Sequence, residues 1–296
     1  MASEIGSVAT PIERLEQALI QKIEAGDVEL PLLPQAASQV LALAADPASD
    51  AAKLSSLIHQ DQALAAHVMR IANSPAYMSR SPVVSLQHAV AMLGITLLSE
   101  IAFTASLKVG AFQMPGYEDE VKQFWRHSLA TGAFAKEVAR AKRMNVESAY
   151  LCGLLHEIGK PVVLRVITTI AREQNIDWVK ALVPILGNKS HVKTLIEGYH
   201  SRVGALIAEK WSLPKQVAAA IQYYEGYDHA DSFRQECLLT CAADRLASHL
   251  LTPDDVPEET LRAHPVFGEL NLYPNDIDQL LTRKDHVLAV VNALNL

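Results

Sequence analysis

The fold of this chain is indicated most clearly by the stretch CGLLHEIGKP at residues 152–161. Around it, small and apolar residues recur at helical spacing, and one face of a predicted helix over 146–158 carries Ala149, Cys152, Gly153 and His156. Gly159 is placed where a helix commonly ends, and Pro161 follows just beyond it. The stretch therefore predicts a buried helix that presents a histidine and a carboxylate, Glu157, at its end.

Helical spacing recurs on both sides of this stretch, with a start or stop signal at most segments. Predicted helices span residues 11–25, 35–45, 50–59, 62–72, 85–94, 96–109, 119–143, 146–158, 162–173, 176–186, 191–211, 214–224, 232–250 and 275–294. Thr10 and Asp61 are the expected N-caps of two of them. The sequence has no alternating strand pattern, and 13 Gly and 14 Pro are few for a turn-rich β protein. We predict an all-α, multi-helical bundle.

Charge is unevenly distributed along the 296 residues. The net charge is −7, and residues 251–296 carry eight acidic and three basic side chains, which leaves only −2 for residues 1–250. A protein that follows nucleic-acid phosphates usually presents a basic face. We therefore expect no nucleic-acid partner.

The termini and the cysteines indicate an intracellular protein. Three cysteines do not make a disulfide framework, and the first residues lack the basic and apolar regions of a signal peptide. We find no uncharged apolar stretch approaching the ~20 residues that span a bilayer. The sequence thus predicts a cytoplasmic protein without a membrane partner.

Three further residues with potential metal-binding side chains, His127, His200 and Asp244, lie on predicted inward faces of helices. His127 is followed by apolar residues at i+7 and i+11, and His200 by apolar residues at i+3 and i+7. Asp244 lies on an otherwise uncharged face, where a buried carboxylate needs a histidine, an arginine or a metal as partner. Imidazole and carboxylate ligands suit divalent metals. The alternative is that each histidine is an ordinary hydrogen-bonded core residue and that Asp244 pairs with Arg245.

Several short runs occur in an order typical of one family. These are Leu30-Pro31, IHQDQ at 58–62, RIANS at 70–74 and AVAMLG at 89–94. Over residues 30–224 the chain resembles the HDOD family, the HD-related output domains of bacterial signalling proteins. Its second half is similar to the wider HD superfamily of metal-dependent phosphohydrolases, which includes the HD-GYP cyclic-di-GMP phosphodiesterases.

The resemblance assigns metal-binding roles to the inward-facing residues. His127 matches the first metal histidine, and His156 matches the histidine of the His-Asp doublet, whose Asp is here Glu157. Asp244 resembles the final aspartate ligand, although it lies outside the best-matched region. His200 resembles an additional ligand of HD-GYP enzymes. The implied cofactor is at most one divalent metal: Mn, Mg, Fe, Ni or Zn.

Other positions depart from the pattern of the active enzymes. Tyr223-Tyr224 stands where HD-GYP enzymes have a His-His pair, and the Gly-Tyr-Pro loop is missing. The exchange of Asp for Glu157 moves a carboxylate by one methylene, and a shift of ~1 Å in a working site can cost about a hundredfold in rate. Phenols are poor ligands near neutral pH. We therefore predict a degenerate site in which catalysis is lost or severely weakened.

Three functions stay open on these grounds. The favoured one is a non-catalytic regulatory module that acts through signalling protein partners or through a ligand in the degenerate site. The second is a single-metal phosphohydrolase that uses His127, His156, Glu157 and Asp244. The third is a nucleotide sensor in which Lys160 and Arg126 meet phosphates, although Lys160 is equally explained as a solvated residue near a helix C-terminus.

The expected organisation has three parts. Residues 1–27 form an arm and a helix, and residues 28–226 form the HDOD-like domain, with an N-terminal helical half to about residue 112 and an HD-like half after it. Residues 227–296 form a C-terminal helical extension.

Overall fold

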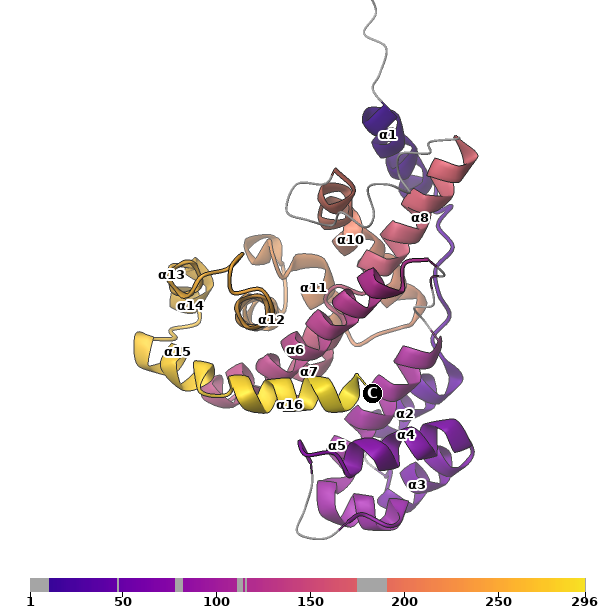
Figure 1. Cartoon of the computed structure of the whole chain (residues 1–296), viewed down its shortest axis with the longest axis vertical. Coiled ribbons are helices and arrows are strands. Elements are labelled where there is room, and N and C mark those ends of the chain that lie inside the picture. Colours follow the sequence, from indigo (N-terminus) through magenta and orange to yellow (C-terminus); the bar gives the residue numbers. More distant parts are fainter. Residues whose placement is uncertain are drawn as a thin grey trace, which may run out of the picture.

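The computed structural model describes residues 11–46, 48–77, 82–110, 114, 116–174 and 191–295. Within these ranges the regular elements are all helical and no strand occurs (Figure 1). This confirms the predicted all-α bundle. The predicted helix over 176–186 and the predicted cap Thr10 lie outside the described residues.

The N-terminal part consists of five helices. They are α1 (Pro11–Glu24), α2 (Gln35–Ala45), α3 (Ala51–His59), α4 (Gln62–Ala72) and α5 (Leu86–Gly110). Asp50 accepts a hydrogen bond from the Lys53 amide, and Asp61 accepts from the amides of Ala63 and Leu64, so both residues cap their helices. α2, α3 and α4 pack against α5 and form the lobe at the bottom of Figure 1.

The remaining helices build the body of the molecule. They are α6 (Glu118–Lys142), α7 (Val146–Leu155), α8 (Gly159–Glu173), α10 (His191–Lys210), α11 (Lys215–Tyr223), the 3-10 turn η2 (Tyr227–His229), α12 (Arg234–Leu251), α13 (Glu258–Arg262), α14 (Pro265–Glu269), α15 (Pro274–Leu281) and α16 (Lys284–Leu294). α6 lies at the centre and packs against α7, α12 and α16, while α8 packs against α10 and α1. α16 crosses α6 and reaches the lobe of α5 (Figure 1).

α5 contains a longer apolar segment than we predicted from the sequence. Between Leu86 and Leu107 it is long and apolar enough to cross a bilayer by length and composition, with half of its most apolar window buried inside the molecule. A count of uninterrupted apolar residues misses it because Glu100 falls within the segment. A core helix passes the same test, and this one packs against α2, α3, α4 and α16. Gly94, at φ 79° and ψ 161°, breaks the helical backbone at the predicted position.

The region after residue 251 differs from the prediction. The single helix expected over 275–294 is two helices, α15 and α16, and the short α13 and α14 were not predicted. The break occurs where the Arg283 amide donates to the Leu280 carbonyl, a tightened i→i−3 turn that ends α15. α15 has its own start signal, because Pro274 occupies its first turn and the Asp276 carboxylate accepts from the Tyr273 amide.

The prediction that Gly159 ends a helix was wrong. α7 already ends at Leu155, and Gly159 begins α8 with Pro161 in its first turn. The glycine is needed because α10 approaches here: a Cβ at Gly159 would lie 2.0 Å from the His200 carbonyl oxygen. Gly153 permits a similar approach between α7 and α6, since its Cβ would lie 2.7 Å from the Thr131 carbonyl oxygen. These contacts bring α6, α7, α8 and α10 together around the candidate site.

Candidate metal centre

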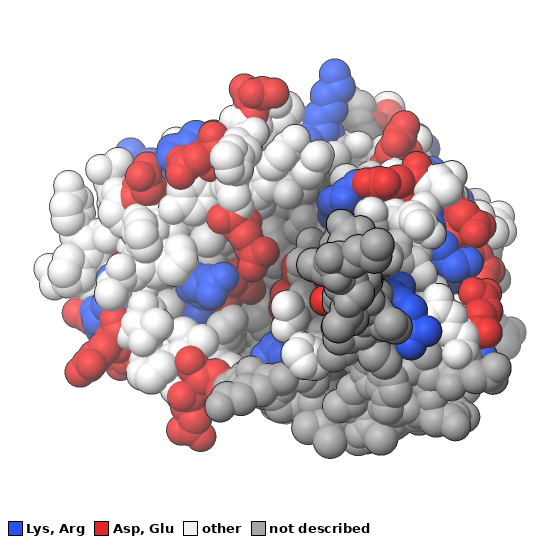
Figure 2. Space-filling model, turned by 90° about the horizontal axis from the view of Figure 1, so that it is seen from above, with Lys and Arg blue, Asp and Glu red and all other residues white. Residues whose placement is uncertain are grey.

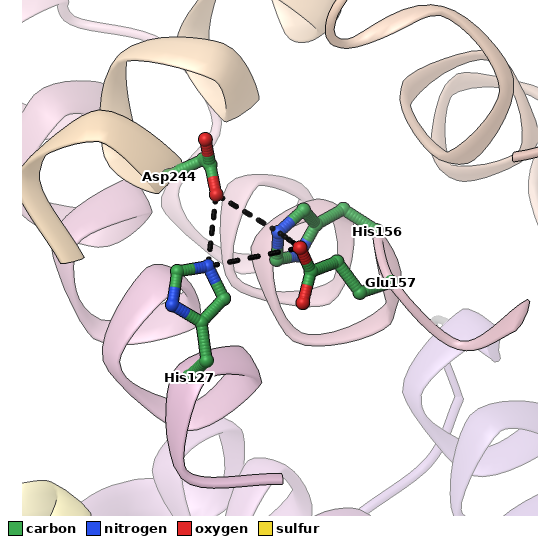
Figure 3. A group of neighbouring side chains, drawn as sticks. All are labelled: His127, His156, Glu157 and Asp244. Atoms are coloured by element: carbon green, nitrogen blue, oxygen red, sulfur yellow. Dashed lines mark hydrogen bonds and ion pairs between the residues drawn. The ribbon is translucent and has the colours of Figure 1, made fainter. Parts of the chain in front are cut away.

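Four of the predicted ligands meet in the centre of the bundle. His127 comes from α6, His156 and Glu157 from the turn between α7 and α8, and Asp244 from α12 (Figure 3). One potential ligand atom of each lies within 4.8 Å of all the others. Residues separated by up to 117 positions thus converge with their nitrogen and oxygen atoms pointing toward one another.

Asp244 is the closest carboxylate to the Nε2 atoms of both imidazoles. Its Oδ1 lies 2.8 Å from His127 Nε2 and 3.5 Å from His156 Nε2. Glu157 Oε1 lies 3.9 Å and 3.8 Å from the same two nitrogens. Both carboxylates are nearly inaccessible, with 6% of each side chain exposed, whereas His127 reaches the surface of the site with 18% of its side chain exposed. The alternative that these residues are unrelated core groups does not fit this convergence.

The tautomer of His156 leaves a lone pair directed into the cluster. Its Nδ1 donates to the Gly153 carbonyl at 2.7 Å, so in the neutral ring Nε2 is the nitrogen that carries the lone pair. His156 is fully buried, and among the described residues Nε2 has no hydrogen-bond partner. Leaving such an acceptor unpaired costs about 1–3 kcal/mol. A backbone carbonyl that orients an imidazole in this way is the usual outer partner of a metal-binding histidine, and the residues therefore fit a divalent metal.

The two carboxylates are held in their ionised form. Burial alone would raise the pKa of Glu157, but the Lys160 ammonium and then the neighbouring imidazoles lower it to about 2. Burial would also raise the pKa of Asp244, and the hydrogen bond from His127 with the nearby His156 holds it well below its usual range. Conversely, burial lowers the pKa of His127, but Glu157 and Asp244 outweigh it and raise that pKa. The cluster therefore carries carboxylate ligands at neutral pH.

The second oxygen of Asp244 faces a different group. Oδ2 lies 3.3 Å from Nε of the adjacent Arg245, whose Nη2 lies 3.8 Å from Glu225 Oε1. The expected Asp244–Arg245 pair is thus present, and it leaves Oδ1 directed toward the histidines. The two interpretations of Asp244 are compatible because each uses a different oxygen.

His200 is not brought into the cluster. Its Nδ1 donates to the Glu197 carbonyl at 2.8 Å, and its Nε2 accepts from the Tyr224 hydroxyl at 3.0 Å. The Tyr224 ring stands edge-on to His156, with centroids 4.8 Å apart. Burial, followed by Glu157, raises the pKa of Tyr224 well above its usual value, so the phenol stays protonated and donates. The nitrogen that His200 would offer to a metal is therefore engaged by the phenol, which in turn supports the His156 ring.

Lys160 is buried, and the interpretation of it as a solvated residue was wrong. Its Nζ lies 2.5 Å from Glu157 Oε1 and 2.8 Å from both oxygens of Glu197. Glu197 was not predicted as a partner, because it stands on α10, 37 residues from Lys160, and has no local signal in the sequence. Both carboxylates, acting against the effect of burial, raise the pKa of Lys160. Its ammonium is therefore committed to two carboxylates, whereas the other predicted phosphate ligand, Arg126, is exposed.

A cleft of about 670 Å³ opens onto the cluster. His127, Glu157 and Asp244 line it together with basic side chains (Arg126, Lys160, Lys193 and Arg245) and acidic ones (Glu197, Glu225 and Asp255). Figure 2 shows basic and acidic side chains interspersed over one face of the molecule as well. The cleft can therefore admit a small ligand with both anionic and hydrogen-bonding groups.

The His127–Asp244 pair predicts the pH dependence of stability in the metal-free protein. The pKa of His127 is raised on folding, so its stabilisation is complete below the unfolded value of 6.5 and is lost as pH rises through the folded pKa. The pKa of Asp244 is lowered, so its stabilisation is present above the unfolded value of 3.8 and is lost as pH falls below it. With a chelator present, thermal unfolding followed by circular dichroism should give the highest midpoint between these two pH values. Asp244→Asn should flatten the profile on both sides, and an unchanged profile would contradict the pair.

Comparison with known proteins gives the same assignment as the motifs. The family model of the HDOD domain matches residues 30–227. An uncharacterized protein of Treponema pallidum (strain Nichols) is 25% identical over 281 residues, which cover 90% of this chain and 51% of that protein. The chain thus spans about half the length of this curated relative.

Solved structures share the fold over nearly the whole chain. A candidate phosphohydrolase of Shewanella amazonensis SB2B superimposes with a TM-score of 0.69 at 21% identity, over 94% of this chain and 98% of that one. An HDOD domain protein of unknown function from Geobacter sulfurreducens gives a TM-score of 0.68 at 23% identity, over 96% and 98% of the two chains. A candidate signal transduction protein of Marinobacter aquaeolei VT8 gives 0.67 at 25% identity, over 99% and 68%. The HD-like bundle predicted from the motifs is therefore confirmed, and because the HDOD model matches more than half of its length, the chain belongs to the HDOD domain family.

Proposed function

We propose that this protein is a non-catalytic regulatory module of bacterial signal transduction that binds one divalent metal at its degenerate HD site. It would act through contacts with signalling proteins or through a ligand in the cleft. Membership of the HDOD family supports the regulatory role, and so does the likeness to the Marinobacter protein that is named for signal transduction. The observation that carries the metal is the buried, unpartnered Nε2 of His156 aimed at two carboxylates.

The number of ligands supports one metal and argues against two. His127, His156, Glu157 and Asp244 each offer one atom to the cluster. A two-metal hydrolytic centre needs ions about 3.5–4 Å apart, each with several ligands. His200 is engaged by Tyr224, and Glu157 is shared with Lys160. The four residues would therefore hold a single ion, which when bound can polarise or anchor an anionic group in the cleft.

Metal content and turnover test this function together. We expect purified protein, dialysed against Mn²⁺, to retain one ion per chain by elemental analysis. We also expect it to hydrolyse cyclic dinucleotides and nucleotides no faster than the Asp244→Asn variant, which lacks a ligand. Hydrolysis at enzyme-like rates that disappears in Asp244→Asn would overturn the non-catalytic role, and absence of bound metal would overturn the metal site.

The second candidate function is a single-metal phosphohydrolase, which the open cleft beside the cluster favours. In that case the metal would activate a water for attack on a phosphate ester, and the turnover arm of the same experiment decides between the two. The nucleotide-sensor alternative is weakened because Lys160 is paired with two carboxylates, and it rests on Arg126 alone of the two predicted phosphate ligands.

A further inference from the structure

The Lys160 ammonium is surrounded by carboxylate oxygens in the manner of a bound cation. Three oxygens lie within 2.8 Å of Nζ: Oε1 of Glu157 and both oxygens of Glu197. Only 8% of the Lys160 side chain is exposed. Glu157 precedes Lys160 by three residues in the turn that leads into α8, whereas Glu197 reaches it from α10. Two helices thus meet around one positive charge.

Glu157 belongs to this arrangement and to the metal cluster at once. The oxygen that contacts Lys160 Nζ, Oε1, is the same atom that lies 3.8 Å from His156 Nε2 and 3.9 Å from His127 Nε2. A carboxylate placed between two cation positions is the usual bridge of a two-metal centre. Glu157 Oε1 would therefore be shared between the proposed metal and the Lys160 ammonium.

We propose that Lys160 is a built-in cation that occupies a second cation position and limits the centre to one metal ion. The inference rests on the proposed four-residue metal site for the first ion. The second position is defined by the three oxygens around Lys160 Nζ, of which Glu157 Oε1 is shared with the cluster and the two Glu197 oxygens are not. Removal of the ammonium leaves Glu157 and Glu197 as an uncompensated pair of anions. Hard divalent ions such as Mn²⁺ and Mg²⁺ prefer such oxygen ligands. A smaller neutral side chain at position 160 therefore opens a second metal position.

The test counts Mn²⁺ ions per chain by equilibrium dialysis and elemental analysis. We expect one ion in the unaltered protein and two in Lys160→Ala. Lys160→Arg keeps the charge and should stay at one. Lys193→Ala removes another cleft lysine and should also stay at one. The double variant Lys160→Ala/Glu197→Gln loses an oxygen ligand of the second position and should return to one. Electron paramagnetic resonance should detect magnetic coupling between the two ions of Lys160→Ala through the shared carboxylate.

The outcomes separate this inference from the metal site itself. One ion in both the unaltered protein and Lys160→Ala overturns the inference and leaves the metal site standing. No ion in the unaltered protein but one in Lys160→Ala, lost again with Glu197→Gln, would support a cation position at Lys160 and overturn both the four-residue site and the limit of one ion. Fewer ions in Lys160→Ala than in the unaltered protein would show that Lys160 only positions Glu157. Lys160→Met, whose side chain ends one atom short of the ammonium, provides a better-packed variant if the alanine variant does not fold.

Discussion

Replacement of His156 by alanine is expected to weaken Mn²⁺ binding by at least about a hundredfold. Loss of an outer partner of a metal ligand commonly costs 10–100-fold in affinity, and here the ligand atom itself is removed. His156 Nε2 is also the one atom of the four whose lone pair has no other partner among the described residues. Isothermal titration calorimetry with Mn²⁺ measures the effect directly.

The control for this experiment is a histidine remote from the cluster. His286 lies exposed on α16, so His286→Ala should leave the Mn²⁺ affinity unchanged. Far-UV circular dichroism establishes that each variant keeps its helices. If His156→Ala binds Mn²⁺ as tightly as the unaltered protein, the metal is held elsewhere and the cluster of Figure 3 is not the binding site.

Gly159→Ala is expected to destabilise the fold by about 3 kcal/mol, the upper end of the usual cost of overpacking. The added Cβ would stand 2.0 Å from the backbone oxygen of His200 and 2.8 Å from the backbone nitrogen of Gly204. Because both obstacles are backbone atoms, α8 and α10 would have to separate. Urea denaturation followed by circular dichroism gives the change in the free energy of unfolding.

Gly198→Ala is the matched control on the same pair of helices. Gly198 lies within α10, and a Cβ there would meet nothing within 4 Å. Alanine is favoured over glycine in a helix interior by roughly 0.8–1 kcal/mol, so this variant should be more stable than the unaltered protein. Equal stability of the Gly159→Ala and Gly198→Ala variants would mean that α8 and α10 are not in close contact.

Much of the fold could be predicted because its signals are local. Asp50 and Asp61 cap helices within their own turns, and Gly94 interrupts α5 through its own backbone angles. The prediction was wrong at Gly159 because the glycine is required there by the close approach of the His200 carbonyl on α10, not by the end of a helix. The local rule that glycine follows a helix end cannot detect a glycine that allows two helices, α8 and α10, to pack closely.

The same distinction holds for the site. The positions of His127, His156 and Asp244 on apolar faces already indicated that these side chains turn inward, and their convergence confirms that part. The sequence did not predict which side chain each of these groups would pair with. Nothing in the local pattern says that Lys160 pairs with Glu197, or that a phenol 24 residues away engages His200. Those pairings depend on how α8, α10 and α11 pack, and they decide which side chains remain available to a ligand.

Asp244 lies on α12, beyond the last residue matched by the HDOD model. The matched domain therefore supplies three of the four converging side chains, and the helix that follows it supplies the last. At the proposed metal site, a change of Asp244 would therefore remove one of the four side chains without altering any residue of the matched domain. A protein cut at the end of the matched domain, residue 227, would lack the Asp244 carboxylate and with it the closest carboxylate to both imidazoles.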